Sequence, residues 1–267
     1  MFWIYCIFAA VFGAIIGSFL NVIILRHNTH IKSKRSFCFS CGHTLEPTEL
    51  IPVVSYAIQG GKCKKCHSKI SSQYFIVELA FALISVIALF INIDANIYFW
   101  AIKYLLTMGI FGLLTCTFVY DLKHKIMPDG WTLGAFILAL IYSAFFGIGI
   151  KMALIGMVIV AIPLLLIYLI SRGRAMGFGD VKFTLFMGAF LGVSSGLLAL
   201  MFSFWIGGIV GCYLLIMSRI GKLRGKFKKI DRKSEIAFGP FLILGTFIVF
   251  IFNLNLDILL TWLSSIL

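Results

Sequence analysis

Long apolar runs dominate this sequence and constrain its fold more than any other feature. They cover roughly 2–25, 74–93, 97–120, 131–149, 151–171, 182–198, 199–217 and 237–265. A helix needs about 20 apolar residues to cross a hydrocarbon core of about 30 Å. Of the chain, 61% is hydrophobic and only 12% is charged, whereas roughly 25% is charged in soluble domains. We predict an all-α polytopic membrane protein with about eight transmembrane helices.

The separations between these runs differ in clarity. The run at 2–25 lacks a basic n-region and a small-residue cleavage site, so it is predicted to be a membrane helix rather than a signal peptide. Short turns at 147–149 and 194–196 are predicted to separate the fourth run from the fifth and the sixth from the seventh. Without these turns the chain would have six or seven spans, which is the alternative. Glycines spaced four apart predict helix-packing faces at Gly13/Gly17, Gly188/Gly192 and Gly207/Gly211.

Basic residues predict the orientation of the chain. Lys and Arg near span ends prefer the cytoplasmic side. Segments 26–73, 121–130, 172–182 and 218–236 contain 21 of the 23 basic residues, which predicts an N-terminus outside and these four segments in the cytoplasm. The net charge of +13 therefore reflects topology and attraction to anionic membrane lipid, and we expect no nucleic-acid partner.

Four cysteines in segment 26–73 form two C-x2-C pairs, Cys38/Cys41 and Cys63/Cys66. This spacing is typical of a closed structural zinc site. Two disulfides are the alternative, but they require an oxidising compartment and this loop is predicted to be cytosolic. We predict a first transmembrane helix at 1–25, a zinc-binding loop at 26–73 and a helical membrane domain at 74–267. His43 and His67 follow the pairs and are expected to be bystanders, and Cys6, Cys116 and Cys212 to be buried structural thiols.

Among the ten acidic residues, four lie at or within the predicted inner membrane boundary: Glu78, Asp121, Asp129 and Asp180. A carboxylate inside a span costs about 2.5–3.5 kcal/mol on insertion scales, so its presence suggests function. Asp121 ends the third run and Asp180 begins the sixth. Two carboxylates that share a proton can activate water and protonate a leaving group, which is the chemistry of an aspartic peptidase.

Structural explanations compete with catalysis at these positions. Asp180 would be a suitable N-cap for the run that follows it, Asp121 could pair with the adjacent Lys123-His124-Lys125, and Asp129 is predicted to cap the fourth span. Gly177 and Gly179 precede Asp180 and leave room for an extended substrate strand against this turn.

The motifs, taken in order, make the chain resemble type IV prepilin peptidases, the G-x-G-D aspartic proteases. They are GSFLNVIILR (17–26), the four cysteines, LIPVVSY (50–56), ISSQYFIVE (70–78), DLKHKIMPD (121–129), MGFGDVK (176–182) and FGPFL (238–242). The resemblance implies that Asp121 and Asp180 are the catalytic pair. Because residue 123 is Lys, the second Asp that many family members carry two residues later is missing here. The first cysteine pair lacks the Pro common in this turn, and Phe75 stands where Pro often follows the Tyr.

The same resemblance implies an enzyme of the bacterial inner membrane that serves type IV pili or protein secretion. It implies cleavage at the cytoplasmic face, after a Gly that ends the short basic leader of a prepilin or pseudopilin. It also implies a second activity, methylation of the new N-terminus with S-adenosylmethionine, although the sequence has no glycine motif for binding that cofactor. Glu78 matches a family glutamate and is expected to support a polar site near the zinc loop or to pair within the helices.

Two other functions remain open at this stage. A presenilin-like intramembrane protease also uses G-x-G-D with a Tyr-Asp pair, which Tyr120 and Asp121 resemble, but it cuts deeper within the substrate helix. A transporter or metal-sensing membrane protein would use the acidic residues for ions and the cysteine loop for regulation. Transporters often contain internal repeats, and we find no convincing repeat in this sequence.

Overall fold

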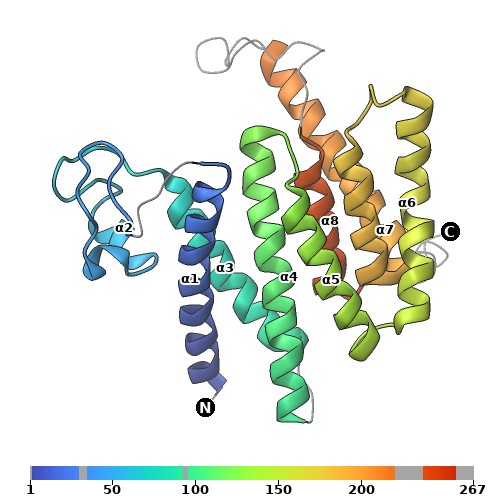
Figure 1. Cartoon of the computed structure of the whole chain (residues 1–267), viewed down its shortest axis with the longest axis horizontal. Coiled ribbons are helices and arrows are strands. Elements are labelled where there is room, and N and C mark those ends of the chain that lie inside the picture. The colour runs from blue at the N-terminus through green and yellow to red at the C-terminus, as the bar shows by residue number, and fades with distance from the viewer. Residues whose placement is uncertain (1, 30–34, 93–95, 220–236, 257–267) are drawn as a thin grey trace. The chain divides into compact units, whose positions relative to one another are not determined.

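The computed structural model describes residues 2–29, 35–92, 96–219 and 237–256, which form helices (Figure 1). The helices are α1 (Phe2–Arg26), η1 (Pro47–Leu50), α2 (Val54–Ile58), α3 (Ser72–Ile91), α4 (Ile97–His124), α5 (Asp129–Phe145), α6 (Ile150–Ser171), α7 (Phe178–Arg219) and α8 (Gly239–Ile251). The described parts of the chain contain two isolated β-bridges and no strand. The predicted all-α class is confirmed.

Five of these helices are long and apolar enough to cross a membrane, judged by length and composition. They are α1, α3, α4, α6 and α7, while α5 and α8 are shorter apolar helices. The count of eight spans stays a prediction. Most of the basic segment at 218–236 and the end of the last apolar run lie outside the described residues.

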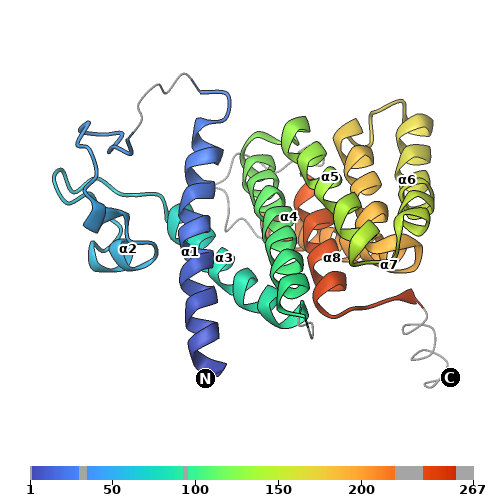
Figure 2. The same cartoon turned by 60° about the horizontal axis from the view of Figure 1, so that its bottom comes forward.

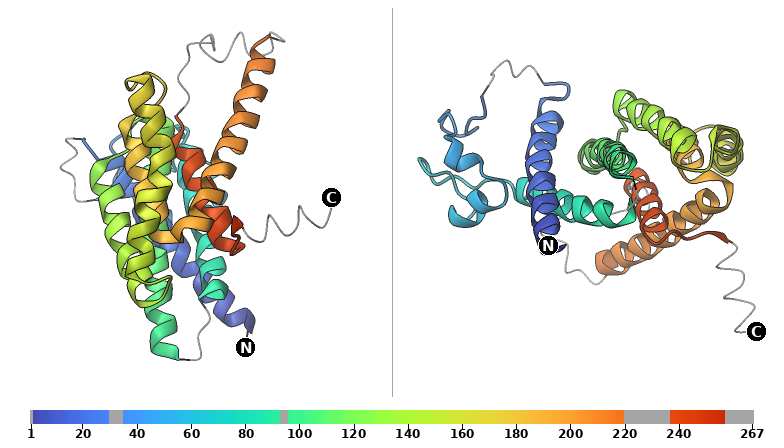
Figure 3. Two further views of the ribbon diagram at one scale, coloured as in Figure 1. Left: turned by 90° about the vertical axis from the view of Figure 1, so that its right-hand side faces the viewer. Right: turned by 90° about the horizontal axis from the view of Figure 1, so that it is seen from below.

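Helix α7 contains both the sixth and the seventh predicted spans. Gly192 interrupts it with φ 79° and ψ −169°, a conformation that glycine adopts far more readily than other residues. Figure 3 shows the two limbs of α7 meeting at an angle. The break therefore comes before the predicted turn at 194–196, because the backbone conformation of Gly192 ends the first limb. The turn predicted at 147–149 is present, with Gly149 at φ 83° before α6.

The chain divides into two compact units, residues 1–116 and 117–267. In the first unit, α1 packs against α3 through the predicted glycine face. A Cβ atom at Gly17 would lie 2.9 Å from Glu78 Cα, and one at Gly13 would lie 2.7 Å from the Phe81 carbonyl oxygen. In lipid the hydrophobic effect does not drive helices together, so close backbone packing of this kind stabilises their association instead.

Buried polar side chains form hydrogen bonds within the first unit. Ser85 Oγ donates to the Ala9 carbonyl of α1 at 2.5 Å and lies 2.6 Å from Tyr104 Oη of α4. Asn21 of α1, 1% exposed, donates to the Tyr74 carbonyl at 3.2 Å. Polar side chains inside an apolar bundle need such partners, because lipid offers none.

The second unit is built around α7, which packs against α5, α6 and α8 (Figure 2). Gly188 of α7 and Gly156 of α6 pack backbone to backbone, and a Cβ on either would collide with the carbonyl oxygen of the other. Ser143 Oγ of α5 donates to the Ala189 carbonyl at 2.7 Å. These contacts hold the first limb of α7, which begins at the GFGD turn.

The third predicted glycine face is only half correct. Gly207 packs against Phe241 and Phe238, whereas a Cβ at Gly211 or at Gly208 would meet no atom of the described residues within 4 Å. Spacing alone could not distinguish these positions, since glycines four apart lie on one side of a helix whether or not a neighbour covers that side.

The packing predicts different effects for two alanine substitutions in the same helix. Gly188→Ala should destabilise the protein by about 2 kcal/mol or more, because the methyl group must displace the α6 backbone. Gly208→Ala is the matched control, and it should leave stability unchanged or slightly raised. Unfolding in detergent micelles measures both. Equal stabilities would show that α6 and α7 do not meet at these glycines.

Candidate active site and metal centre

Asp121 lies in the last turn of α4 and is 4% exposed. A carboxylate at a helix C-terminus opposes the helix dipole, so capping does not explain it. Within the described residues, Asp121 forms no ion pair with Lys123 or Lys125, the structural alternative considered above. Asp121 is thus a buried acid that the helix dipole does not stabilise and with which no described Lys or Arg forms an ion pair.

Asp180 is the third residue of α7 and is half-buried. Since α7 begins at Phe178, Asp180 lies inside the first turn, and the expectation that it is the N-cap is wrong. Its N–H donates to the Gly177 carbonyl at 3.3 Å. Asp180 and Asp121 both belong to the second unit. The catalytic pairing of the two carboxylates stays a prediction.

Two neighbours of this pair were not singled out from the sequence. A Cβ at Gly239, the first residue of α8, would collide with Asp121 Oδ2 and with Met127 Cε. Met127 also lies beside the GFGD turn, with its Cβ 3.5 Å from the Cβ position of Gly179. The FGPFL and DLKHKIMPD motifs contained both residues, but only packing shows that they border the acids.

The glycines of the GFGD turn have different surroundings. Gly179 faces Met127, whereas the nearest atoms to a Cβ at Gly177 are Gly179 N at 3.9 Å and Asp180 Oδ2 at 4.0 Å. Gly177 is exposed. The turn therefore has one open side and one side covered by a thioether.

Asp129 does not cap α5 as predicted. It is the first residue of that helix, and its Oδ1 accepts a hydrogen bond from Lys182 Nζ at 2.8 Å. The ammonium group of Lys182 also lies 5.5 Å from the Phe178 ring centre. The ion pair joins the start of α5 to the start of α7, two residues beyond Asp180.

The four cysteines converge in the first unit. Cys38, Cys41, Cys63 and Cys66 are all unoxidised, and their Sγ atoms lie within 4.8 Å of one another. Such a set fits one tetrahedral ion such as zinc, with four thiolate ligands. His43 and His67 are not part of the group.

Both cysteine pairs use the same backbone turn. Cys38 N donates to the His43 carbonyl at 2.8 Å and Cys63 N to the Ser68 carbonyl at 2.9 Å. Gly42 and His67 occupy the same position in the two turns, with φ of 70° and 55°. This repeated turn is the geometry that would let each C-x2-C segment curl around one ion.

Local hydrogen bonds favour the thiolate at two of the four cysteines, Cys38 and Cys66. At Cys41, the hydrogen bond from the His43 backbone is outweighed by burial and the neighbouring thiols, which raise the pKa to about 11. Backbone N–H groups of Cys41 and Ser40 donate to Cys38 Sγ and lower the pKa of that thiol to about 6. The hydroxyl and N–H of Ser68 lower the pKa of Cys66, whose Sγ is 3.1 Å from Ser68 Oγ. Deprotonated sulfur is the form that binds metal.

Glu49 and Glu78 accept hydrogen bonds from the loop that contains the four cysteines. Glu49 is buried, although the sequence indicated only a soluble loop residue, and its Oε2 accepts from Glu46 N at 2.9 Å and lies 3.1 Å from His43 Nε2. The Glu46 N–H, followed by the His43 imidazole, lowers the pKa of Glu49. Glu78 Oε2 accepts from Val53 N at 2.7 Å and holds Val53 at φ 63°. Glu78 therefore pairs with backbone of the LIPVVSY segment.

Two stretches of the chain match the profiles of known protein families. The profile of the bacterial peptidase A24 N-terminal domain matches residues 11–92, and that of the type IV leader peptidase family matches 108–212. A prepilin leader peptidase/N-methyltransferase of Vibrio cholerae is 32% identical over 208 residues, which cover 72% of this chain and 80% of the relative. The chain belongs to the type IV leader peptidase family.

Other relatives of this leader peptidase family extend the match along the chain. Proteins of the same name from Pseudomonas putida and Neisseria gonorrhoeae are 27% and 28% identical. These alignments cover 90% and 92% of this chain and 88% and 90% of the relatives. No solved structure gives a significant match.

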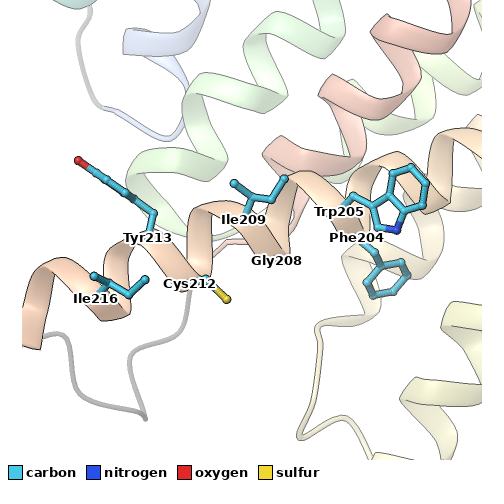
Figure 4. Close-up of a pocket in the computed structure, with 7 residues that line it drawn as sticks. All are labelled: Phe204, Trp205, Gly208, Ile209, Cys212, Tyr213 and Ile216. Atoms are coloured by element: carbon cyan, nitrogen blue, oxygen red, sulfur yellow. The ribbon is translucent and has the colours of Figure 1, made fainter.

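This leader peptidase family member also has a groove of about 650 Å³ on the second limb of α7 (Figure 4). Its lining is almost entirely apolar, with Gly208 and Cys212 between larger side chains. Cys212 is exposed here, so the expectation of a buried thiol is wrong, whereas Cys116 is buried as predicted. The chain is a multi-pass membrane protein, and lipid is the ordinary occupant of such a surface.

The cysteine geometry predicts a zinc content that depends on the cluster alone. Cys63→Ala should abolish stoichiometric zinc and lower the thermal stability of the purified protein, because three thiolates cannot close the site. Cys116→Ala, a substitution of a buried thiol outside the cluster, should keep its zinc. Elemental analysis measures both, and zinc retained by the Cys63 variant would contradict the assignment.

Proposed function

We propose that this protein is an aspartic endopeptidase that removes the leader from prepilins or pseudopilins, with Asp121 and Asp180 as its catalytic pair. The observation that carries the proposal is a buried carboxylate at a helix end, Asp121, which lies beside Met127, the same side chain that borders the turn leading into Asp180. Family membership supports the substrate class, because the relatives are named prepilin leader peptidases.

The proposed reaction uses the two acids in opposite protonation states. Like charges at short range oppose double ionisation, so one carboxyl group holds a proton while the other is ionised. The ionised group takes a proton from water, and the hydroxide formed attacks the scissile carbonyl carbon. The protonated group then donates to the amide nitrogen as the C–N bond breaks. The two products are the free leader peptide and the mature protein with its new N-terminal amine.

The surroundings of the acids suit an extended substrate. Gly177 is exposed with an open side, so a substrate backbone has room to approach Asp180. Asp121 lies four residues before α4 gives way to the loop at Lys125. This position at a helix end favours a cut near the membrane edge over the deep cut of a presenilin-like protease.

The distribution of basic residues supports the orientation that we propose. The N-terminus lies outside the bacterial inner membrane, and the catalytic pair and cysteine loop are at the cytoplasmic face. In this orientation the four cysteines stand in a reducing compartment. Cys38, Cys41, Cys63 and Cys66 would hold a structural zinc ion that fixes their two turns, and this ion takes no part in bond cleavage.

We include in the proposal N-methylation of the new N-terminus, with S-adenosylmethionine as the methyl donor. The names of the relatives support this second activity. No residue is assigned to the cofactor, because the chain has no glycine motif for it.

The proposed pair predicts a strong and selective effect of amide substitutions. Asp121→Asn and Asp180→Asn should each lower prepilin cleavage by a factor of about 10³ or more, because an amide can neither accept nor donate the required proton. Glu46→Gln, a control at an exposed acid of the cysteine loop, should keep most of the activity. Cleavage is followed with purified, folded variants. Wild-type rates in either of the first two variants would exclude the shared-proton mechanism.

The second activity predicts a mass difference in the product. Prepilin incubated with purified enzyme and S-adenosylmethionine should yield a mature N-terminus heavier by one methyl group than the product made without the cofactor. Mass spectrometry of the N-terminal peptide measures this. The Asp180→Asn variant is the control and should yield neither product. Identical masses with and without the cofactor would remove methylation from the proposal.

A further inference from the structure

Met127 has an unusual position between two glycines that flank the acids. Its Cβ lies 3.5 Å and its Sδ 3.8 Å from the Cβ position of Gly179, next to Asp180. The far end of the same side chain, Cε, would overlap with a Cβ at Gly239, next to Asp121. The thioether therefore runs from the GFGD turn to the start of α8.

The space beside Asp121 is already filled by this side chain. A Cβ at Gly239 would collide with both Met127 Cε and Asp121 Oδ2, so one methyl group more does not fit there. Met127 is only half-buried, so it also faces accessible space. Among the described residues no comparable wall stands beside Gly177, where a Cβ would find its nearest neighbours at 3.9 Å and beyond.

We propose that Met127 is a specificity-determining residue, whose side chain limits the substrate residue next to the acids to one with no or a very small side chain. The inference rests on the proposed function of Asp121 and Asp180. For hydrolysis, the scissile carbonyl must come within about 3–3.5 Å of the water held by these acids. The substrate residue bearing that carbonyl then lies against Met127, where a larger side chain would overlap with the thioether.

The chemistry of methionine suits this role. Its side chain is apolar and fills irregular gaps, so it excludes side chains without offering them a polar partner. One methyl group in a tight apolar site changes discrimination by roughly 10–200-fold. Removal of Cγ, Sδ and Cε should therefore widen the range of substrates that are cut.

The test compares kcat/KM for one prepilin carrying Gly, Ala or Val before the cleaved bond. The full-length enzyme should prefer Gly over Ala by roughly tenfold or more. In Met127→Ala this preference should fall by roughly tenfold, since the space released admits a methyl group. Met127→Val should shift it less in the same direction, and it serves as the second variant should the alanine variant not fold.

Two controls make the result specific. Met152→Ala removes an exposed methionine of α6 and should leave the preference unchanged. Met127→Leu keeps the volume and should also leave it unchanged. An unaltered Gly-to-Ala preference in both Met127→Ala and Met127→Val would overturn the inference. If Asp180→Asn had lost cleavage in the same experiments, the proposed function would still be supported. Undiminished cleavage by Asp180→Asn would instead refute the proposed function itself.

Discussion

Close backbone contact between helices is the constraint on which the rest of this structure depends. Lipid is as apolar as a leucine side chain, so burial of such side chains gives membrane helices little reason to associate. Glycine removes the side chain and lets backbones meet, as at Gly17 against α3 and Gly188 against Gly156. The second of these contacts holds the limb of α7 that begins with the GFGD turn. The position of Asp180 therefore follows from packing deeper in the bundle.

The same constraint shapes the site itself. Gly239 brings the start of α8 against Asp121, and the missing side chain leaves space that Met127 fills. The ion pair of Asp129 with Lys182 links α5 to α7 near the same turn. A buried acid is costly in an apolar bundle, so the packing of neighbouring helices must hold Asp121 in place. The arrangement is consistent with carboxylates retained for chemistry rather than for stability.

The cysteine cluster depends on local contacts instead. Its four thiols come from two short loop segments, and each C-x2-C pair forms the same backbone turn through its own hydrogen bonds. Spacing along the chain therefore predicted the cluster well, because the geometry of four thiolates around one ion is local to each pair. Glu49 and Glu78, which tie this loop to itself and to α3, act through long-range contacts that spacing does not reveal.

The sequence by itself determined the all-helical membrane class, most helix positions, the cysteine cluster and the two acids to examine. These features depend on the length of apolar runs, the spacing of metal ligands and the cost of charge in lipid, all of which are properties of residues along the chain. Tertiary structure decided the rest. Asp129 pairs with Lys182 instead of capping α5, the break in α7 falls at Gly192, and Gly211 packs on nothing within the described residues. Met127 and Gly239 became neighbours of the acids only in three dimensions, because residues far apart in sequence meet there through helix packing.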